Sequence, residues 1–207
     1  MKIAGNKTSA DWQSSKASLV VGGNQTLWKE VHQEFFLKRL SLRYLNPIET
    51  LQERGNREGE GFSIVALQCV LLEFLASTVK GKSYLHNHKP KTPPDPKDPF
   101  YSNSKELFVE FLHTYSPFKS SFNRKTAEDF YTGVRCGLVH EARTKNGWII
   151  RANKSSKNMI DLKSKKVNRY ALQDAIIDFL KWYEKELLTN KSVQEAFIVK
   201  FDNLSQP

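Results

Sequence analysis

The sequence predicts an all-α protein, a helical bundle of four to five main helices with a small β-hairpin insertion and a long proline-rich loop. Three observations support this fold class. Apolar residues recur at helical spacing over several long segments, one segment is apolar on nearly every side, and five of the eight prolines lie together between residues 90 and 99. The 207 residues suffice for one domain with a sizeable core.

Residues 1–25 are rich in Ser, Asn, Gly and Lys, so we expect a loosely ordered segment ahead of a helical domain over residues 26–190. The apolar spacing predicts a first long helix from Leu27 to Leu45. Pro47 is expected to end this helix, because the residue before a proline is pushed out of helical space. A short helix from Ile48 to Arg54 and a polar, glycine-rich loop should follow.

The segment from Phe62 to Leu75 is apolar on nearly every side, which is typical of a central, buried helix. It contains Gln68 and is too short to span a bilayer. Glu73 is its only charged residue, and a buried carboxylate needs a partner. Either Glu73 lies at the rim beside a lysine or arginine, or it binds Arg135 in a bidentate contact and orients that guanidinium.

Residues 82–103 are expected to form an extended proline-rich loop. His86 and His88 lie in this loop, but two histidines without a third ligand do not predict a metal site. We therefore expect no metal and no cofactor. A helix from Ser104 to Tyr115 should follow and end before Pro117.

Near the C-terminus the pattern changes to alternating short runs. Residues 147–163 are predicted to form a β-hairpin of two short strands that leans on the helices. Asn168 can cap the last long helix, from Arg169 to Leu188. Residues 191–207 are expected to form a short C-terminal helix that Ser192 opens.

The most informative helix begins near residue 126. Thr126 and Asp129 have the spacing of a capping box, with Thr126 as the N-cap. Three apolar residues then recur every fourth position and predict one buried face: Phe130, Val134 and Leu138.

Gly137 weakens this helix, so we expect the helix to end near His140. Arg135 would then lie in the last turn and His140 at the exit. Five residues of regular α-helix turn by about 140°, so the helix must break between them for both side chains to reach one phosphate. Alternatively, both cationic residues only stabilise the negative end of the helix dipole.

The pair Arg135-x4-His140 at the end of an apolar helix resembles the R-x(4–6)-H signature of the HEPN superfamily, small all-α domains that include many metal-independent ribonucleases. The resemblance implies an endoribonuclease of the toxin or phage-defence kind, in which the 2′-hydroxyl attacks and a 2′,3′-cyclic phosphate remains. His140 would move a proton, and Arg135 would stabilise the charge on phosphorus. Glu73 and Tyr131 are expected to support this site.

The same resemblance implies a homodimer in which two motifs face each other across a two-fold axis. A toxin of this kind also implies an antitoxin or another protein partner. A non-catalytic HEPN-like module that binds nucleotide, RNA or a partner protein is the alternative. A scaffold whose basic hairpin only docks on nucleic acid is a third reading.

The net charge of +10 indicates an acidic partner, with nucleic acid first, although a solvated basic surface would give the same total. The charge is concentrated, because residues 143–169 hold nine basic residues against one acid. Five of them are expected to hold the RNA backbone: Arg143, Lys145, Arg151, Lys154 and Lys157.

The two cysteines, Cys69 and Cys136, lie in apolar helical contexts and predict free, buried thiols in a reducing compartment. The N-terminus has no apolar run that would predict a secretory signal. We therefore expect a soluble, cytoplasmic protein without a membrane partner.

Overall fold

The computed structural model describes residues 1–54, 58–90, 92, 95 and 98–206 of the chain, and 64% of the structure is helical. The predicted mostly helical class is therefore confirmed. The contacts divide the chain into two compact units. The first unit comprises Met1–Arg43, Phe74–Ser104 and Trp182–Pro207, and the second comprises Tyr44–Glu73 and Lys105–Lys181. A single domain over residues 26–190 does not describe this division.

The first unit begins with structure where we expected a loosely ordered segment. Strands β1 (Lys2–Ala4) and β2 (Lys7–Thr8) form an antiparallel pair, and helix α1 (Ser9–Ala17) follows directly. Thr8 and Asp11 cap α1 reciprocally, and Trp12 is fully buried. The prediction for residues 1–25 was wrong because the burial of one large aromatic side chain outweighs a polar composition.

A long helical run follows in five pieces: α2 (Gln25–Val31), η1 (His32–Leu37), α3 (Lys38–Leu40), η2 (Ser41–Leu45) and α4 (Asn46–Glu53). The pieces η1 and η2 are wider, π-helical turns. Pro47 lies at the start of α4 and does not end the run, contrary to our expectation. A proline has no backbone N–H with which to continue the hydrogen bonds of an α-helix. The wider turn η2 directly before α4 changes these hydrogen bonds, so the helical run can accept a proline there.

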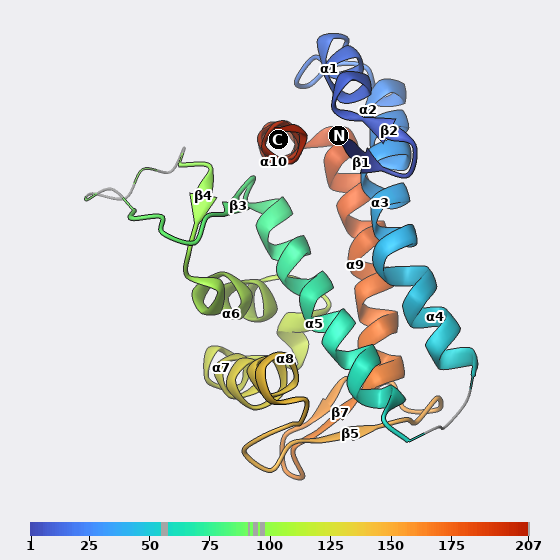
Figure 1. The fold of residues 1–207 in the computed structure, drawn as a ribbon, viewed down its shortest axis with the longest axis vertical. Coiled ribbons are helices and arrows are strands. Elements are labelled where there is room, and N and C mark those ends of the chain that lie inside the picture. The colour runs from blue at the N-terminus through green and yellow to red at the C-terminus, as the bar shows by residue number, and fades with distance from the viewer. Residues whose placement is uncertain (55–57, 91, 93–94, 96–97, 207) are drawn as a thin grey trace. The chain divides into compact units, whose positions relative to one another are not determined.

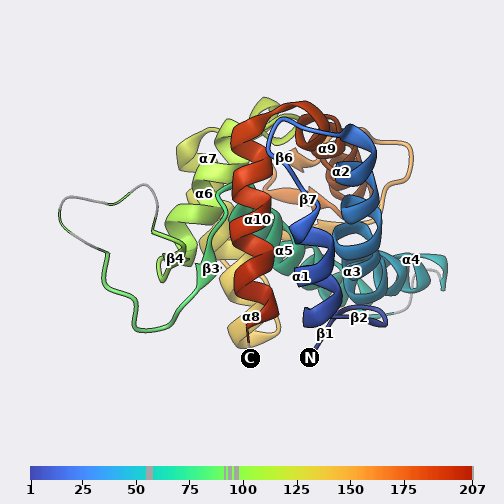
Figure 2. The ribbon, with the colours of Figure 1, turned by 90° about the horizontal axis from the view of Figure 1, so that it is seen from above.

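Helix α10 (Lys191–Ser205) completes the first unit and lies within the bounds expected for the C-terminal helix. Asn190, rather than Ser192, caps it, because its side chain accepts a hydrogen bond from the Ser192 backbone. Helices α1 and α10 run side by side (Figure 2), and the Trp12 ring packs against the ring of Phe197. Trp12 Nε1 also donates to Asp202 Oδ1 over 2.9 Å. The last helix is therefore part of the core of its unit.

The proline-rich segment contains two short strands, β3 (Ser83–Tyr84) and β4 (Phe100–Tyr101), which pair in parallel. The remaining described residues of 82–103 form no helix or strand. Pro93, Pro94 and Pro96 lie outside the described residues.

Helix α5 (Glu60–Val79) contributes to both units. By length and composition it could cross a membrane, but 56% of its apolar window is buried inside the protein. The Gln68 side chain donates to the Arg169 carbonyl over 2.8 Å. A buried polar side chain that is bound to another element of the same chain is typical of a core helix.

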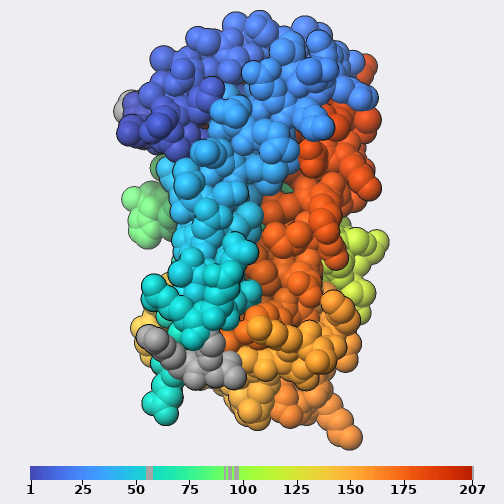
Figure 3. Space-filling view, turned by 90° about the vertical axis from the view of Figure 1, so that its right-hand side faces the viewer, coloured from blue at the N-terminus to red at the C-terminus, as the bar shows by residue number. Residues whose placement is uncertain are grey.

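The second unit contains α4 and the following helices: α6 (Ser104–Thr114), the short 3₁₀ turn η3 (Phe118–Ser120), α7 (Arg124–Phe130), η4 (Tyr131–Cys136), α8 (Gly137–Glu141) and the first part of α9 (Arg169–Thr189). The residues of α9 from Trp182 onward belong to the first unit. Figure 1 shows α7 and α8 as one continuous rod, joined by the π-helical turn η4. In Figure 3 the surface of residues 46–53 lies against that of the start of α9, where Gln52 bonds the Arg169 carbonyl over 3.5 Å.

The predicted β-hairpin over residues 147–163 was wrong in its pairing. Three strands form a sheet in the order β5 (Ile149–Arg151), β7 (Lys166–Asn168) and β6 (Ile160–Asp161). Strand β5 pairs in parallel with β7 (Figure 1), and β6 pairs antiparallel with it. The sequence hides β7 because only Val167 is apolar in that lysine-rich run, yet Val167 is fully buried.

Candidate functional site

The helical rod α7–η4–α8 carries the candidate residues, and its ends are well defined. Asn123, rather than Thr126, is the N-cap: Thr126 N donates to Asn123 Oδ1 and Asn123 N donates to Thr126 Oγ1, each over 2.9 Å. The capping box therefore starts three residues earlier than predicted. At the other end Ala142 adopts a left-handed conformation with φ of 51° and terminates the helix after Glu141.

The predicted buried face of this rod is confirmed, since Phe130, Val134 and Leu138 are all buried. The segment between Tyr131 and Cys136 is a π-helical turn. Such turns insert one extra residue into a helix and are found frequently at functional sites. Arg135 lies in this turn.

Arg135 is tied to Glu73 of α5. Its Nη2 donates to Glu73 Oε2 over 2.9 Å, and the two side chains are only 16% and 14% exposed. The guanidinium also lies 5.3 Å from the centre of the Tyr131 ring, in a cation–π contact. Of the two alternatives for Glu73, the structure therefore shows the contact with Arg135, through one hydrogen bond rather than the expected bidentate pair.

The environment of this cluster favours an unreactive, permanently charged guanidinium. Burial opposes the charge on Arg135, but Glu73, Tyr131 and Cys136 together outweigh it and raise the pKa of Arg135. Burial also raises the pKa of the Tyr131 hydroxyl to about 12, although Arg135 acts in the opposite direction. Burial raises the pKa of the Cys69 thiol to about 12 as well. Both hydroxyl and thiol are thus neutral near pH 7.

Cys69 and Cys136 are free thiols, as predicted, with Cys69 buried and Cys136 half-buried. The two cysteines do not have a spacing that is typical of metal ligands. In the described residues no three His, Cys, Asp or Glu side chains come together in a way that could hold a metal ion. His88 Nε2 instead contacts Asp98 Oδ2 over 2.6 Å, and His86 Nδ1 contacts the Tyr84 hydroxyl over 3.1 Å.

His140 is exposed in the last turn of α8, and no hydrogen bond or ion pair joins its ring to any other residue in the described part of the chain. The helix ends next to His140, as predicted, but it does not break between Arg135 and His140. A continuous helix turns the two side chains away from each other by more than a right angle. Within one chain, Arg135 therefore faces α5 while His140 faces solvent.

The basic residues predicted to hold RNA lie in different surroundings. Arg143 and Lys145 both bind Glu141, with Arg143 Nη2 3.0 Å from Glu141 Oε2. These hydrogen bonds, that of Lys145 first, lower the pKa of the Glu141 carboxyl. Lys154 lies over the Tyr170 ring at 5.4 Å. The site at the helix exit thus contains two cations that share one anion.

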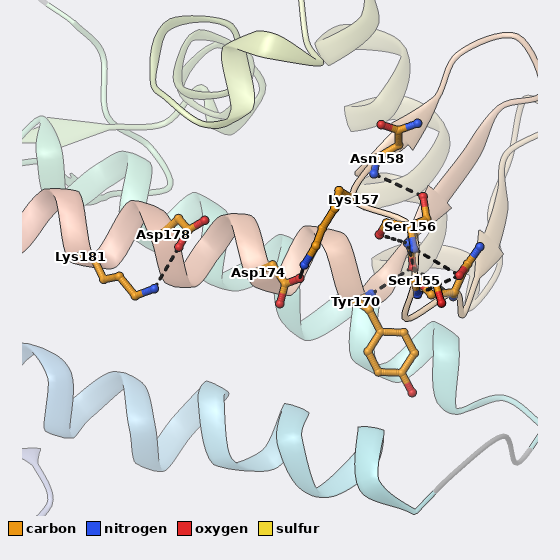
Figure 4. A network of polar contacts seen from close by, with 10 residues as sticks. Ser155, Ser156, Lys157, Asn158, Tyr170, Asp174, Asp178 and Lys181 are labelled. Atoms are coloured by element: carbon orange, nitrogen blue, oxygen red, sulfur yellow. Dashed lines mark hydrogen bonds and ion pairs between the residues drawn. The ribbon is translucent and has the colours of Figure 1, made fainter.

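The other two predicted RNA contacts, Arg151 and Lys157, border two adjoining hollows beside the sheet. Lys157 Nζ lies 3.6 Å from Asp174 Oδ2, and Figure 4 shows it reaching from its loop to helix α9. Both side chains are largely exposed, so this ion pair contributes little to stability.

Asp129 has a role that its position in the sequence did not reveal. Its Oδ2 accepts a hydrogen bond from Trp148 Nε1 over 3.1 Å and lies 2.9 Å from Lys165 Nζ. Asp129 therefore joins the sheet region to the helix that carries Arg135. We had assigned Asp129 to the helix cap, and only the buried Trp148 could have signalled a long-range partner.

Two glycines of the motif helix allow this close packing. A Cβ at Gly133 would lie 2.5 Å from Trp148 Cδ1, and a Cβ at Gly137 would lie 2.4 Å from the Arg143 carbonyl oxygen. The segment after the helix therefore folds back directly onto the helix backbone. Gly137 is present for this approach, and not only to weaken the helix.

No protein-family model, curated protein or solved structure matches this chain.

Proposed function

We propose that the chain is a HEPN-like, metal-independent endoribonuclease in which His140 moves a proton and Arg135 stabilises the phosphate. The proposal rests on the way in which Glu73 and Tyr131 hold the Arg135 guanidinium. A half-buried guanidinium, held by Glu73 and stacked on Tyr131, has one orientation and a permanent charge. Such a preorganised cation is suited to the charge that develops on a phosphodiester during cleavage.

His140 suits the second task because it is exposed and uncommitted. Histidine is the side chain most often used for general acid–base catalysis. Acting as a base, it would take the proton of the ribose 2′-hydroxyl as that oxygen attacks phosphorus. The leaving 5′-oxygen then needs a proton, which a second imidazole or the same one can return.

The divergence of the two side chains within one chain makes the dimer part of the proposal. His140 of one protomer would meet Arg135 of its partner across a two-fold axis, so that two composite sites form. A two-fold interface brings the same surface of both chains together, which places each motif opposite its copy. The HEPN resemblance implies a dimer in which both motifs line one composite cleft, and we propose that within it each His140 acts with the partner's Arg135.

The biological setting follows from the same resemblance and is proposed with it. A ribonuclease of the toxin or phage-defence kind acts in the cytoplasm and requires restraint, by an antitoxin or another protein partner. Lys145 and Arg143 lie one turn beyond His140 and would hold the RNA backbone on either side of the scissile bond.

The alternative is a non-catalytic module that binds nucleotide, RNA or a protein. One observation favours it: Arg135 is already bound to Glu73 and lies away from His140 in the single chain. A guanidinium that is fixed by its own chain can be structural alone. Catalysis and binding are therefore to be measured separately.

A cleavage assay in EDTA separates the two. The native chain should cut a labelled single-stranded RNA and leave a 2′,3′-cyclic phosphate. His140→Ala and Arg135→Ala should each lower the rate by about a hundredfold or more, because each removes one catalytic contribution. His140→Ala should keep RNA affinity.

The matched controls are His86→Ala and Arg43→Ala, which remove an exposed histidine and an exposed arginine outside the motif. Both should cut at the native rate. RNA binding without cleavage by any variant would favour the non-catalytic module. Unchanged cleavage in His140→Ala would overturn the proposed mechanism.

A further inference from the structure

A polar hollow of about 730 Å³ lies beside the sheet of the second unit, apart from Arg135 and His140. Its lining combines three kinds of group: cations, amides and hydroxyls, and apolar side chains. Arg151 and Lys166 supply the cations, Asn153 and Asn158 supply amides, and Leu162 supplies an apolar wall. Ligand-binding pockets of proteins have this size and this mixture of apolar walls with a few polar groups.

The wall of the hollow is built around a buried amide. Asn168 Nδ2 donates to the carbonyl oxygens of Asn153 and Ser156 over 2.8 and 3.2 Å. Its Oδ1 accepts from the backbone of Asn153 and Tyr170, each over 3.3 Å. With all four of these positions occupied, Asn168 fixes the loop 153–156 and cannot itself contact a ligand. The pocket is therefore shaped before any ligand binds.

The loop also carries its own turn. Asn153 Oδ1 accepts from the backbone of Ser155 and Ser156, and Ser156 Oγ accepts from Asn158 N over 3.3 Å. Figure 4 shows the Asn158 side chain at the edge of this network, with its amide pointing away from helix α9. In the described part of the chain no hydrogen bond uses the Asn158 amide, so it can bind a ligand.

Arg151 is the strongest candidate for a phosphate contact. It is exposed, it lies at the end of β5, and no hydrogen bond or ion pair joins it to another residue that the structure describes. Lys166 lies near the acidic residue of the lining, Asp161, whose carboxyl has a pKa lowered mainly by hydrogen bonds from Ser164. The lining therefore contains two cations and one anion, and Lys166 pairs with Asp161 across strands β6 and β7. Arg151 is the cation that does not lie opposite this carboxylate in the sheet.

The apolar side of the pocket suits a base. Leu162 is 47% exposed and lies in the same lining as Arg151. An exposed leucine in the same lining as Arg151 and the Asn158 amide offers an apolar surface against which the face of a base can pack, while the edge of the base meets hydrogen-bonding groups. A base inside a duplex could not enter such a pocket.

We propose that this pocket binds one nucleotide of a single-stranded RNA. Arg151 holds the phosphate, Leu162 covers the face of the base, and the Asn158 amide bonds the edge of the base. The inference deepens the proposed function by placing the RNA strand on the chain. A second hollow of about 670 Å³ shares Asn158 with the first and contains Lys157, so the strand can continue along the surface of α9.

The test uses a fluorescein-labelled, mixed-sequence RNA octamer with 2′-O-methyl groups, followed by fluorescence anisotropy. The octamer lacks the attacking hydroxyl and cannot be cut, so binding is measured whether or not the chain is a nuclease. Arg151→Ala should weaken binding by roughly tenfold and lower the slope of log affinity against log salt by about one. If homopolymers of the four bases replace the mixed sequence, Asn158→Ala should weaken the binding of one homopolymer more than that of the others.

Arg43→Ala is the matched control, because it removes one exposed arginine elsewhere on the chain. It should change the affinity by less than about twofold. Equal losses in Arg151→Ala and Arg43→Ala would overturn the pocket and leave only a diffuse basic surface. Equal affinity for a duplex octamer would overturn insertion of a base.

Free nucleotides form the last arm. If 5′-UMP or 5′-AMP binds with the same affinity as the octamer, the ligand of the pocket is a free nucleotide, and the proposal that it binds an RNA strand is overturned. Circular dichroism melts of every variant show whether the fold is kept. If the native chain binds the octamer through Arg151 but cuts no RNA, the inference about this pocket stands and the nuclease proposal fails.

Discussion

Arg135 Nη2 and Glu73 Oε2 lie 2.9 Å apart, and this contact joins the π-helical turn of the motif helix to helix α5. Both side chains are mostly buried, so each depends on the other for compensation of its charge. The contact fixes the direction of the guanidinium.

Removal of the Glu73 carboxylate should therefore destabilise the protein. We expect Glu73→Ala to lower the free energy of unfolding by about 1–3 kcal/mol, because it leaves a half-buried guanidinium without its anion. Glu53→Ala, at an exposed position, should have little effect. Urea unfolding measures both. In a double-mutant cycle, Glu73→Ala with Arg135→Ala should cost less than the sum of the two single changes; strict additivity would show that the pair is not coupled.

The sequence allowed the buried face of this helix and the need of Glu73 for a partner to be predicted, because both signals are local. Phe130, Val134 and Leu138 repeat at helical spacing, and Glu73 is the only charged residue in its apolar segment. An isolated carboxylate in such a segment has few possible partners. Charge and burial predicted that Glu73 has a cationic partner, but they did not decide between a rim lysine or arginine and Arg135.

The features that could not be predicted depend on contacts between distant residues. Strand β7 contains a single apolar residue, Val167, and exists because it pairs with β5 and β6 on either side. The order of residues 1–17 depends on Trp12 packing against helix α10, almost at the other end of the chain. The pocket beside Arg151 depends on both strand order and the hydrogen bonds of Asn168.

The glycines of the motif helix give a second prediction. Gly137→Ala should destabilise the protein by about 1–3 kcal/mol, because the added methyl would collide with the Arg143 carbonyl, which is backbone and cannot turn aside. Gly133→Ala should act in the same direction through Trp148. Thermal melting and urea unfolding measure the change.

Gly61→Ala is the control for these variants. Gly61 lies in the first turn of α5, and an added methyl there meets a side-chain methyl of Ile150 at 3.2 Å. Alanine favours a helix over glycine by about 0.5–1 kcal/mol, so this change should be close to neutral. A Gly137→Ala variant as stable as Gly61→Ala would contradict the close packing.

His32 gives a third prediction, on pH dependence. It is fully buried in the first unit, with Nδ1 4.0 Å from Glu184 Oε1. Burial lowers the pKa of His32 from 6.5 to about 4, while Glu184 acts in the opposite direction. The unfolded chain therefore binds more protons than the folded one between these pH values. Stability is full above pH 6.5 and falls as the pH decreases to about 4.

The size of this effect is about 3 kcal/mol, from the shift in pKa. Urea unfolding at pH 7.5 and pH 4.5 measures it, with His32→Phe as the control for all other titrating groups. Phenylalanine suits this position because His32 already packs against Phe36, with ring centres 5.2 Å apart. The native chain should lose about 2–3 kcal/mol more than His32→Phe; equal losses would place the pH dependence elsewhere.

The most direct test of the central claim is a defined heterodimer, made by co-expression of two differently tagged chains and purification on both tags. If Arg135 of one chain acts with His140 of the other, an Arg135→Ala chain paired with a His140→Ala chain keeps one intact site. It should cut RNA at about half the rate of the native dimer. A native chain paired with the double variant should then be inactive. Activity of the second pairing and inactivity of the first would contradict the composite site.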